Sequence, residues 1–159
     1  TLKRRKRRHL TGDAVAFCDR ARTARPDMVF GADLIAGLPT ETDEMFQGTL
    51  DHVAACGLTY LHVFPYSPRP KTPAAKMPQL PKAEIKARAA WLRALGAERL
   101  AAFQHGEIGR TRQVLMESAR MGRTEGFAEV LFDSDQPVGE ITPSRSVGLR
   151  EGRLLGEAL

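Results

Sequence analysis

Two turn-rich segments of the chain carry side chains that could bind a ligand, and the first of them spans residues 37–42 (GLPTET). Gly37 lets the backbone approach a ligand closely, and Glu41 can accept hydrogen bonds from a ribose or an amine. Asp33 lies just upstream, in a nearly continuous apolar run over 28–36 where a carboxylate needs a partner or a ligand. The alternative is a tight strand-to-helix turn whose acidic residues complement the dipole of the following helix.

The second segment, 64–70 (FPYSPRP), is more specific. Phe64 and Tyr66 offer flat aromatic faces that suit an adenine ring, and the Arg69 guanidinium suits phosphate or a carboxylate. The alternative is a rigid, proline-locked loop at the rim of the fold. His62 fits a hydrogen-bonded core residue better than a catalyst. Because the sequence has no Ser/His/Asp triad, HExxH motif or phosphate-binding loop, we assign no catalytic residue and no metal ligand.

The order of the surrounding elements predicts that these two segments meet. The apolar run over 28–36 is typical of a strand buried on both faces, and 58–64 reads as a second strand. Between them, 42–57 has the spacing of a helix with an acidic first turn and a glycine stop. A strand–helix–strand unit is a right-handed crossover by default, so both loops should leave the same edge of a parallel sheet, where α/β proteins bind ligands.

The remaining segments complete an α/β fold with a separate, smaller part. A helix is expected over 13–24, and a second, long helix over 81–105 after a proline-rich stretch. Beyond it, short apolar pieces separated by turns predict a small antiparallel β-barrel, with strands at 113–116, 127–132, 138–141 and 152–156.

The domain organisation follows from what these elements can cover. Two parallel strands with three helices cannot cover a sheet on both faces, so we expect the last part of a larger, open α/β barrel whose missing portion precedes Thr1. We divide the chain into barrel strands and helices at 1–80, a connecting helix at 81–105 and the small β-barrel at 106–159.

The net charge of +5 is concentrated at the start of the chain. Residues 3–8 are all basic, and without them the charge of the chain is slightly negative. Lys6, Arg7 and Arg8 could contact a polyanion such as RNA, or the run could be a solvated, positively charged loop.

Cysteine usage and hydropathy indicate the compartment. Cys18 and Cys56 form no CxxC motif, so we interpret both as small core residues in a reducing, cytoplasmic environment. The sequence has no apolar run of the length that a membrane span requires.

With these residues identified, the chain resembles the C-terminal part of a radical S-adenosylmethionine tRNA methylthiotransferase, of the branch that modifies threonylcarbamoyladenosine beside the anticodon. The matching segments cover nearly the whole chain: 6–9 (KRRH), 31–42 (GADLIAGLPTET), 61–69 (LHVFPYSPR), 72–74 (TPA) and 122–125 (GRTE). The resemblance implies an open radical-SAM barrel of partial TIM type, followed by an RNA-binding β-barrel of the TRAM type.

The resemblance also implies cofactors and their contacts. S-adenosylmethionine (SAM) would be bound by residues of the two loop segments, namely Asp33, Gly37, Glu41, Phe64 and Tyr66. Arg69, with Lys6, Arg7 and Arg8, would face substrate or tRNA. The 4Fe–4S clusters of such enzymes have no ligands in this chain, because the CxxxCxxC motif is absent, so we expect the chain alone to be inactive.

Two other interpretations remain open. The basic N-terminal run and the small barrel are also consistent with a non-catalytic RNA-binding module. The loop motifs, which related radical enzymes share more loosely, are consistent with a different radical-SAM barrel enzyme.

Overall fold

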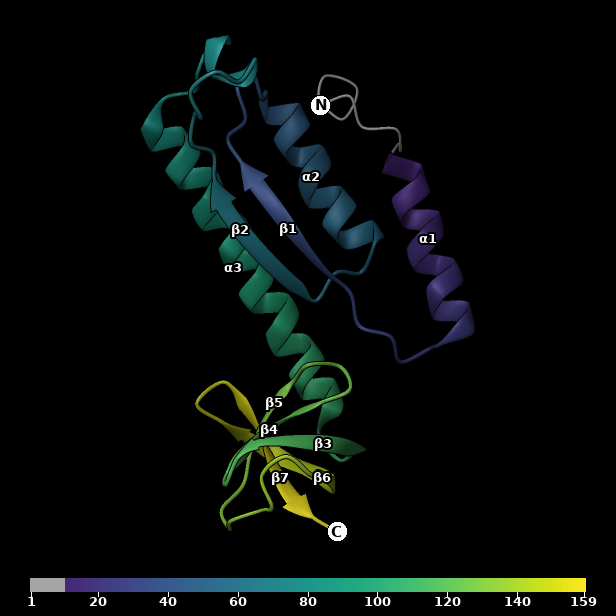
Figure 1. The fold of residues 1–159 in the computed structure, drawn as a ribbon. Helices are drawn as coiled ribbons and strands as arrows, with labels where there is room; N and C mark the ends of the chain where they lie inside the picture. The colour runs from purple at the N-terminus through teal and green to yellow at the C-terminus, as the bar shows by residue number, and fades with distance from the viewer. Residues whose placement is uncertain (1–10) are drawn as a thin grey trace. The chain divides into compact units, whose positions relative to one another are not determined.

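The structure is a computed structural model in which residues 11–159 are described. It divides into two compact units, the first ending at Arg99 and the second running from Leu100 to Leu159 (Figure 1). The boundary falls within the longest helix, α3 (Lys82–Glu107), whose two portions belong to different units.

The first unit is built on two parallel strands. Its other elements are α1 (Thr11–Ala24), β1 (Gly31–Ala36), α2 (Asp43–Ala55), β2 (Tyr60–Pro65) and the short 3-10 helix η2 (Ala74–Lys76). The register places Asp33 opposite His62 and Ile35 opposite Phe64. Both strands end at the same edge, as Figure 1 shows, which confirms the strand–helix–strand prediction.

Local sequence explains where α2 begins and where it ends. The Thr42 side chain caps the helix by accepting a hydrogen bond from the Met45 backbone N–H at 3.3 Å. Gly57 follows the helix with a φ of +57°, a left-handed conformation that glycine adopts without steric cost. Both signals were present in the sequence, and both boundaries agree with its prediction.

Only one face of the strand pair is covered by helices within the described residues. Ala36 and the partly buried Leu34 and Val63 pack with side chains of α2 and α3. The alternate residues of β1 are exposed, as are His62 and Phe64 of β2. The prediction of a first strand buried on both faces is therefore wrong. The strand is shorter than expected, and its burial alternates with the period of two that one covered face imposes. Asp33 lies on the exposed face, so its carboxylate needs no buried partner.

The two cysteines lie in the core between α1 and the end of α2, which confirms that both are core residues. Cys18 is 6% exposed and Cys56 is 2% exposed, and neither is in a disulfide. Burial, together with the neighbouring Cys18, raises the pKa of the Cys56 thiol. A thiol in this environment is a weak nucleophile, consistent with a packing role.

The second unit is a closed β-barrel of five strands in the order β3-β4-β5-β7-β6. The strands are β3 (Thr111–Ser118), β4 (Met121–Thr124), β5 (Glu129–Leu131), β6 (Ile141–Arg150) and β7 (Arg153–Ala158). Its core contains Val114, Met116, Ala128, Val130, Phe132 and Leu154. The prediction of a small barrel is confirmed, but the barrel is not wholly antiparallel, because β5 and β7 pair in parallel.

The prediction of a strand at 138–141 is wrong, and the reason is physical. Strand β6 starts only at Ile141, after a turn in which Gly139 has a φ of +84°. Its inward side chains are hydroxylic, since Thr142, Ser144 and Ser146 are buried while Ile141 is exposed. Apolar periodicity therefore points to the wrong face of this strand. No helix among residues 11–159 combines the length and apolar character needed to cross a membrane.

Candidate functional site

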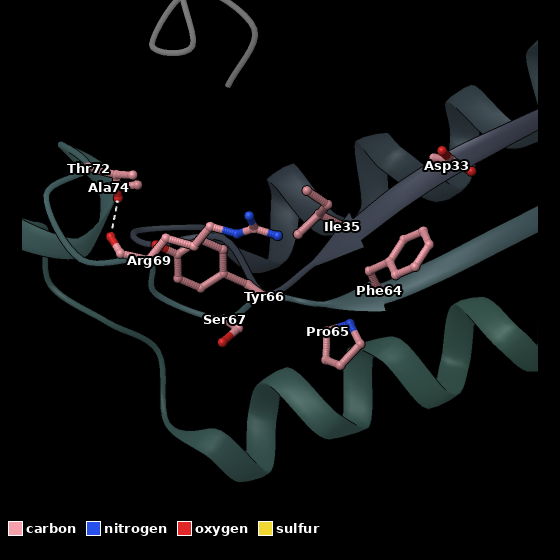
Figure 2. Close-up of a pocket in the computed structure, with 9 residues that line it drawn as sticks. All are labelled: Asp33, Ile35, Phe64, Pro65, Tyr66, Ser67, Arg69, Thr72 and Ala74. Atoms are coloured by element: carbon pink, nitrogen blue, oxygen red, sulfur yellow. Dashed lines mark hydrogen bonds between the residues drawn. The ribbon is translucent and has the colours of Figure 1, made fainter.

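A groove opens where β1 and β2 end, at the edge that the sequence indicates. Its volume is about 610 Å³, within the range of about 300–1,000 Å³ typical of small-molecule sites. Nine residues line it, as Figure 2 shows: Asp33, Ile35, Phe64, Pro65, Tyr66, Ser67, Arg69, Thr72 and Ala74. Four of the residues that we selected from the sequence, Asp33, Phe64, Tyr66 and Arg69, are thus brought together.

The wall formed by the strands is apolar with one carboxylate. Ile35 and Phe64 are opposite each other in the register and are 42% and 53% exposed, so together they present an apolar surface. Asp33 lies two residues before Ile35 on the same face. This wall can therefore contact a flat apolar ring and accept hydrogen bonds beside it.

Tyr66 carries the most informative polar atom of the groove. Its backbone N–H donates to the Ala36 carbonyl at 2.8 Å, which extends the strand pairing into the loop and fixes the residue. Its hydroxyl is buried and has no hydrogen-bond partner among residues 11–159. A buried hydroxyl without a partner is costly, so the donor and acceptor capacity of this group is available to a ligand.

The opposite end of the groove is formed by the loop after β2. The Arg69 carbonyl accepts hydrogen bonds from the Thr72 hydroxyl at 2.8 Å and from the Thr72 backbone N–H at 3.3 Å. The hydroxyl contact is the dashed line in Figure 2, and it closes a tight turn before η2. The Arg69 guanidinium points back toward the end of β1 in that view. The groove thus combines a cation, a carboxylate and apolar surface.

Gly37 and Glu41 do not line the groove. They instead stabilise the loop between β1 and α2. The buried Glu41 carboxylate accepts hydrogen bonds from the Gly37 backbone N–H at 3.0 Å and from Arg88 at 2.8 Å. Gly37 has a φ of +75°, and a Cβ on it would lie 2.7–2.9 Å from carbons of Ile85. Direct contact of either residue with a cofactor stays a prediction.

Arg88 is the residue that sequence reasoning missed. It is 5% exposed and also contacts Asp43 at 2.8 Å and Glu84 at 2.6 Å. Burial opposes its charge, but the hydrogen bond and charge of Glu41, with those of the other carboxylates, raise the pKa of the guanidinium overall. The available signal was its position, since Arg88 falls on the apolar stripe of α3 beside Ala89.

The β-barrel unit carries many arginines, but most are neutralised locally. Ion pairs to carboxylates involve Arg110, Arg112, Arg120, Arg123, Arg150 and Arg153. The Arg153 hydrogen bond, aided by Arg123, lowers the pKa of Glu129, and Arg150 lowers that of Asp133. Within the described residues, the barrel surface thus offers fewer unneutralised cations than its composition suggests.

Two sets of residues complete the survey of sequence-based sites. Lys6, Arg7 and Arg8 lie outside the described residues. Between residues 11 and 159, no cluster of three or more His, Cys, Asp or Glu side chains is arranged to hold a metal ion.

Comparison with known proteins finds homologues that align with almost the whole chain, although no family model matches it. The chain is homologous to part of proteins named tRNA methylthiotransferases, the family that its loop motifs resemble. Threonylcarbamoyladenosine tRNA methylthiotransferase MtaB of Rickettsia prowazekii is 45% identical over 95% of the chain. Proteins named tRNA-2-methylthio-N(6)-dimethylallyladenosine synthase are 34% identical over 99% of it in Erythrobacter litoralis and 41% identical over 92% in Paracoccus denitrificans. The chain spans 36%, 37% and 33% of the length of these three relatives.

Proposed function

We propose that this chain is the C-terminal part of a radical-SAM tRNA methylthiotransferase that acts on threonylcarbamoyladenosine next to the anticodon. The name of the Rickettsia relative, at 45% identity, supports this substrate over dimethylallyladenosine, which the names of the less similar relatives contain. The same names favour methylthiolation over the chemistry of other radical-SAM barrel enzymes. In this proposal residues 1–80 belong to the catalytic barrel and 106–159 form a TRAM-like domain.

The observation that carries the proposal is the groove with its buried, unpartnered Tyr66 hydroxyl at the end of two parallel strands. We assign SAM to it: Ile35 and Phe64 would contact the adenine ring, and Tyr66 would hydrogen-bond a polar group of the cofactor. Asp33 would accept a hydrogen bond from the ribose or the amino group of SAM, and its negative charge would complement the positive charge of the cofactor. When bound, SAM supplies the methyl group and the radical chemistry that methylthiolation requires.

The residues of the β1–α2 loop would contribute to this site by fixing the backbone beside it. Glu41 fixes the Gly37 backbone and is itself held by Arg88, so the loop next to the groove is rigid. Preorganisation of this kind lowers the entropic cost of binding. Arg69, at the other end of the groove, would face the substrate nucleotide.

We expect the ligands of the iron–sulfur clusters to lie outside this chain. Its two cysteines are buried in a hydrophobic cluster that contains no groove residue. The proposal therefore requires cluster ligands in a further part of the polypeptide, and the chain alone should not methylthiolate tRNA.

Deletion of the gene tests the proposed function. The expected result is complete loss of the methylthio form of threonylcarbamoyladenosine from bulk tRNA, measured by mass spectrometry of nucleosides, with restoration by the intact gene. Methylthiolated dimethylallyladenosine in the same sample is the internal control and should not change. Unchanged methylthio-threonylcarbamoyladenosine in the deletion strain would exclude the proposal.

Replacing Tyr66 by phenylalanine tests the SAM assignment. Loss of one hydrogen bond to a neutral group costs about 0.5–1.5 kcal/mol, so the SAM dissociation constant should rise by a factor of about 2 to 13. The thermal stability without ligand should stay equal or rise, because the variant removes a buried, unsatisfied hydroxyl. Equilibrium dialysis with SAM and a thermal melt measure the two effects.

Tyr60→Phe is the matched control, since it deletes the same atom from the only other tyrosine, which does not line the groove. It should leave SAM affinity unchanged. Equal SAM affinity in Tyr66→Phe and the parent would remove Tyr66 from the site.

A further inference from the structure

The loop that follows β2 concentrates unneutralised positive charge. Between residues 66 and 81 it contains Arg69, Lys71 and Lys76 and no acidic residue. All three side chains are exposed. Within residues 11–159, no hydrogen bond or ion pair involves their charged groups. Figure 1 shows this loop beyond the ends of β1 and β2, at the groove edge of the unit.

Many other cations among residues 11–159 are neutralised by carboxylates. The guanidinium of Arg88 contacts three carboxylates, and the arginines of the barrel are mostly paired with acids. Cations left without acidic neighbours keep a positive potential that attracts phosphate, and each phosphate they neutralise releases counterions. The loop 66–81 is therefore a better phosphate-binding surface than the barrel, despite having fewer basic residues.

The backbone at Lys71 gives a second, independent indication. Its φ is +67°, a left-handed conformation that glycine or asparagine adopts readily and lysine rarely does. The turn around it is fixed by the contacts between Thr72 and the Arg69 carbonyl. A residue held in an unfavourable conformation beside a binding groove indicates a functional requirement for its side chain. Here the side chain contributes one ammonium group next to Arg69.

We propose that Arg69, Lys71 and Lys76 bind backbone phosphates of the RNA that flank the nucleoside entering the groove. The inference rests on the proposed function and adds to it a phosphate-binding site outside the β-barrel. Three cations spread over a loop and the helix η2 fit a chain of phosphates better than a single anion. Because backbone contacts carry no sequence information, the loop would position the RNA while the groove selects the nucleoside.

The test measures how binding to a fluorescent anticodon stem-loop RNA depends on salt, using the complete encoded polypeptide. Lys71→Gly and Lys76→Gln should each make the slope of log K against log[salt] less negative by about 0.7–0.9. That change corresponds to an affinity about fivefold to eightfold lower at 0.1 M salt, with the difference vanishing near 1 M. Lys71→Gly should also melt at an equal or higher temperature than the parent, since glycine relieves the left-handed backbone.

Two matched variants control for charge and fold. Lys71→Arg keeps the charge and should keep the parental slope. Lys86→Gln removes the same charge from the exposed surface of α3 and should also leave the slope unchanged. A parental slope in both Lys71→Gly and Lys76→Gln, or no RNA binding by the parent at 0.1 M salt, would overturn the inference. If methylthiolated threonylcarbamoyladenosine still disappears on gene deletion, only the phosphate site is wrong. If it persists, the proposed function itself fails.

Discussion

Arg88→Met should lower the free energy of unfolding of the first unit by about 3–5 kcal/mol, because it leaves the buried Glu41 carboxylate without its cation. The same change removes the contacts to Asp43 and Glu84. Unfolding by urea can be followed through the fluorescence of Trp91, the only tryptophan, which packs edge-on against Phe46. This signal reports on the first unit alone.

Arg93→Met is the matched control on the same helix. Arg93 is exposed and makes one hydrogen bond, to the Val63 carbonyl at 3.1 Å, so its loss should cost only about 1 kcal/mol. The double variant Glu41→Met with Arg88→Met should cost less than Arg88→Met alone, because no buried charge remains unpaired. If Arg88→Met were no more destabilising than Arg93→Met, the ion pair would not be what fixes the loop.

Gly37→Ala should destabilise the first unit by about 2–5 kcal/mol, through two additive effects. The left-handed φ of +75° costs an alanine about 1–2 kcal/mol. The added Cβ would also meet three carbons of Ile85 at 2.7–2.9 Å, and overpacking of this kind costs about 1–3 kcal/mol. Urea unfolding followed by Trp91 fluorescence again provides the measurement.

Gly48→Ala provides a control of opposite sign. Gly48 lies within α2 with open space at its Cβ position, so alanine there should stabilise the helix by up to about 1 kcal/mol. Ile85→Ala removes two of the three close carbons and should reduce the cost of Gly37→Ala measured in that background. An equal cost in both backgrounds would show that the backbone conformation alone requires glycine.

The sequence was sufficient to predict how the groove is assembled. Pro and Gly after apolar runs marked the loops, and the helix-length spacing between the strands implied a parallel crossover, which brings both loops to one edge. Asp33, Phe64, Tyr66 and Arg69 line the same groove for that reason. Local rules of this kind depend only on chain order and strand direction.

Long-range packing could not be predicted in the same way. Whether a strand is covered on one face or two depends on where the helices pack, so the burial of Asp33 was misjudged. Strand β6 has hydroxyls inside the barrel, which reverses the usual apolar pattern. Arg88 was overlooked because a basic residue on an apolar stripe is recognised as buried only when its distant partners Glu41 and Asp43, more than forty positions upstream, are known.

The parallel pairing of β5 with β7 has a consequence for how this protein is made. Strand β7 is inserted between β5 and β6, and Leu154 on it is completely buried in the barrel core. During translation the four earlier strands therefore emerge from the ribosome unable to close, since only β7 fills the gap between β5 and β6. Closure has to wait for β7, and premature termination upstream of it would release a nascent chain with an open sheet edge prone to association.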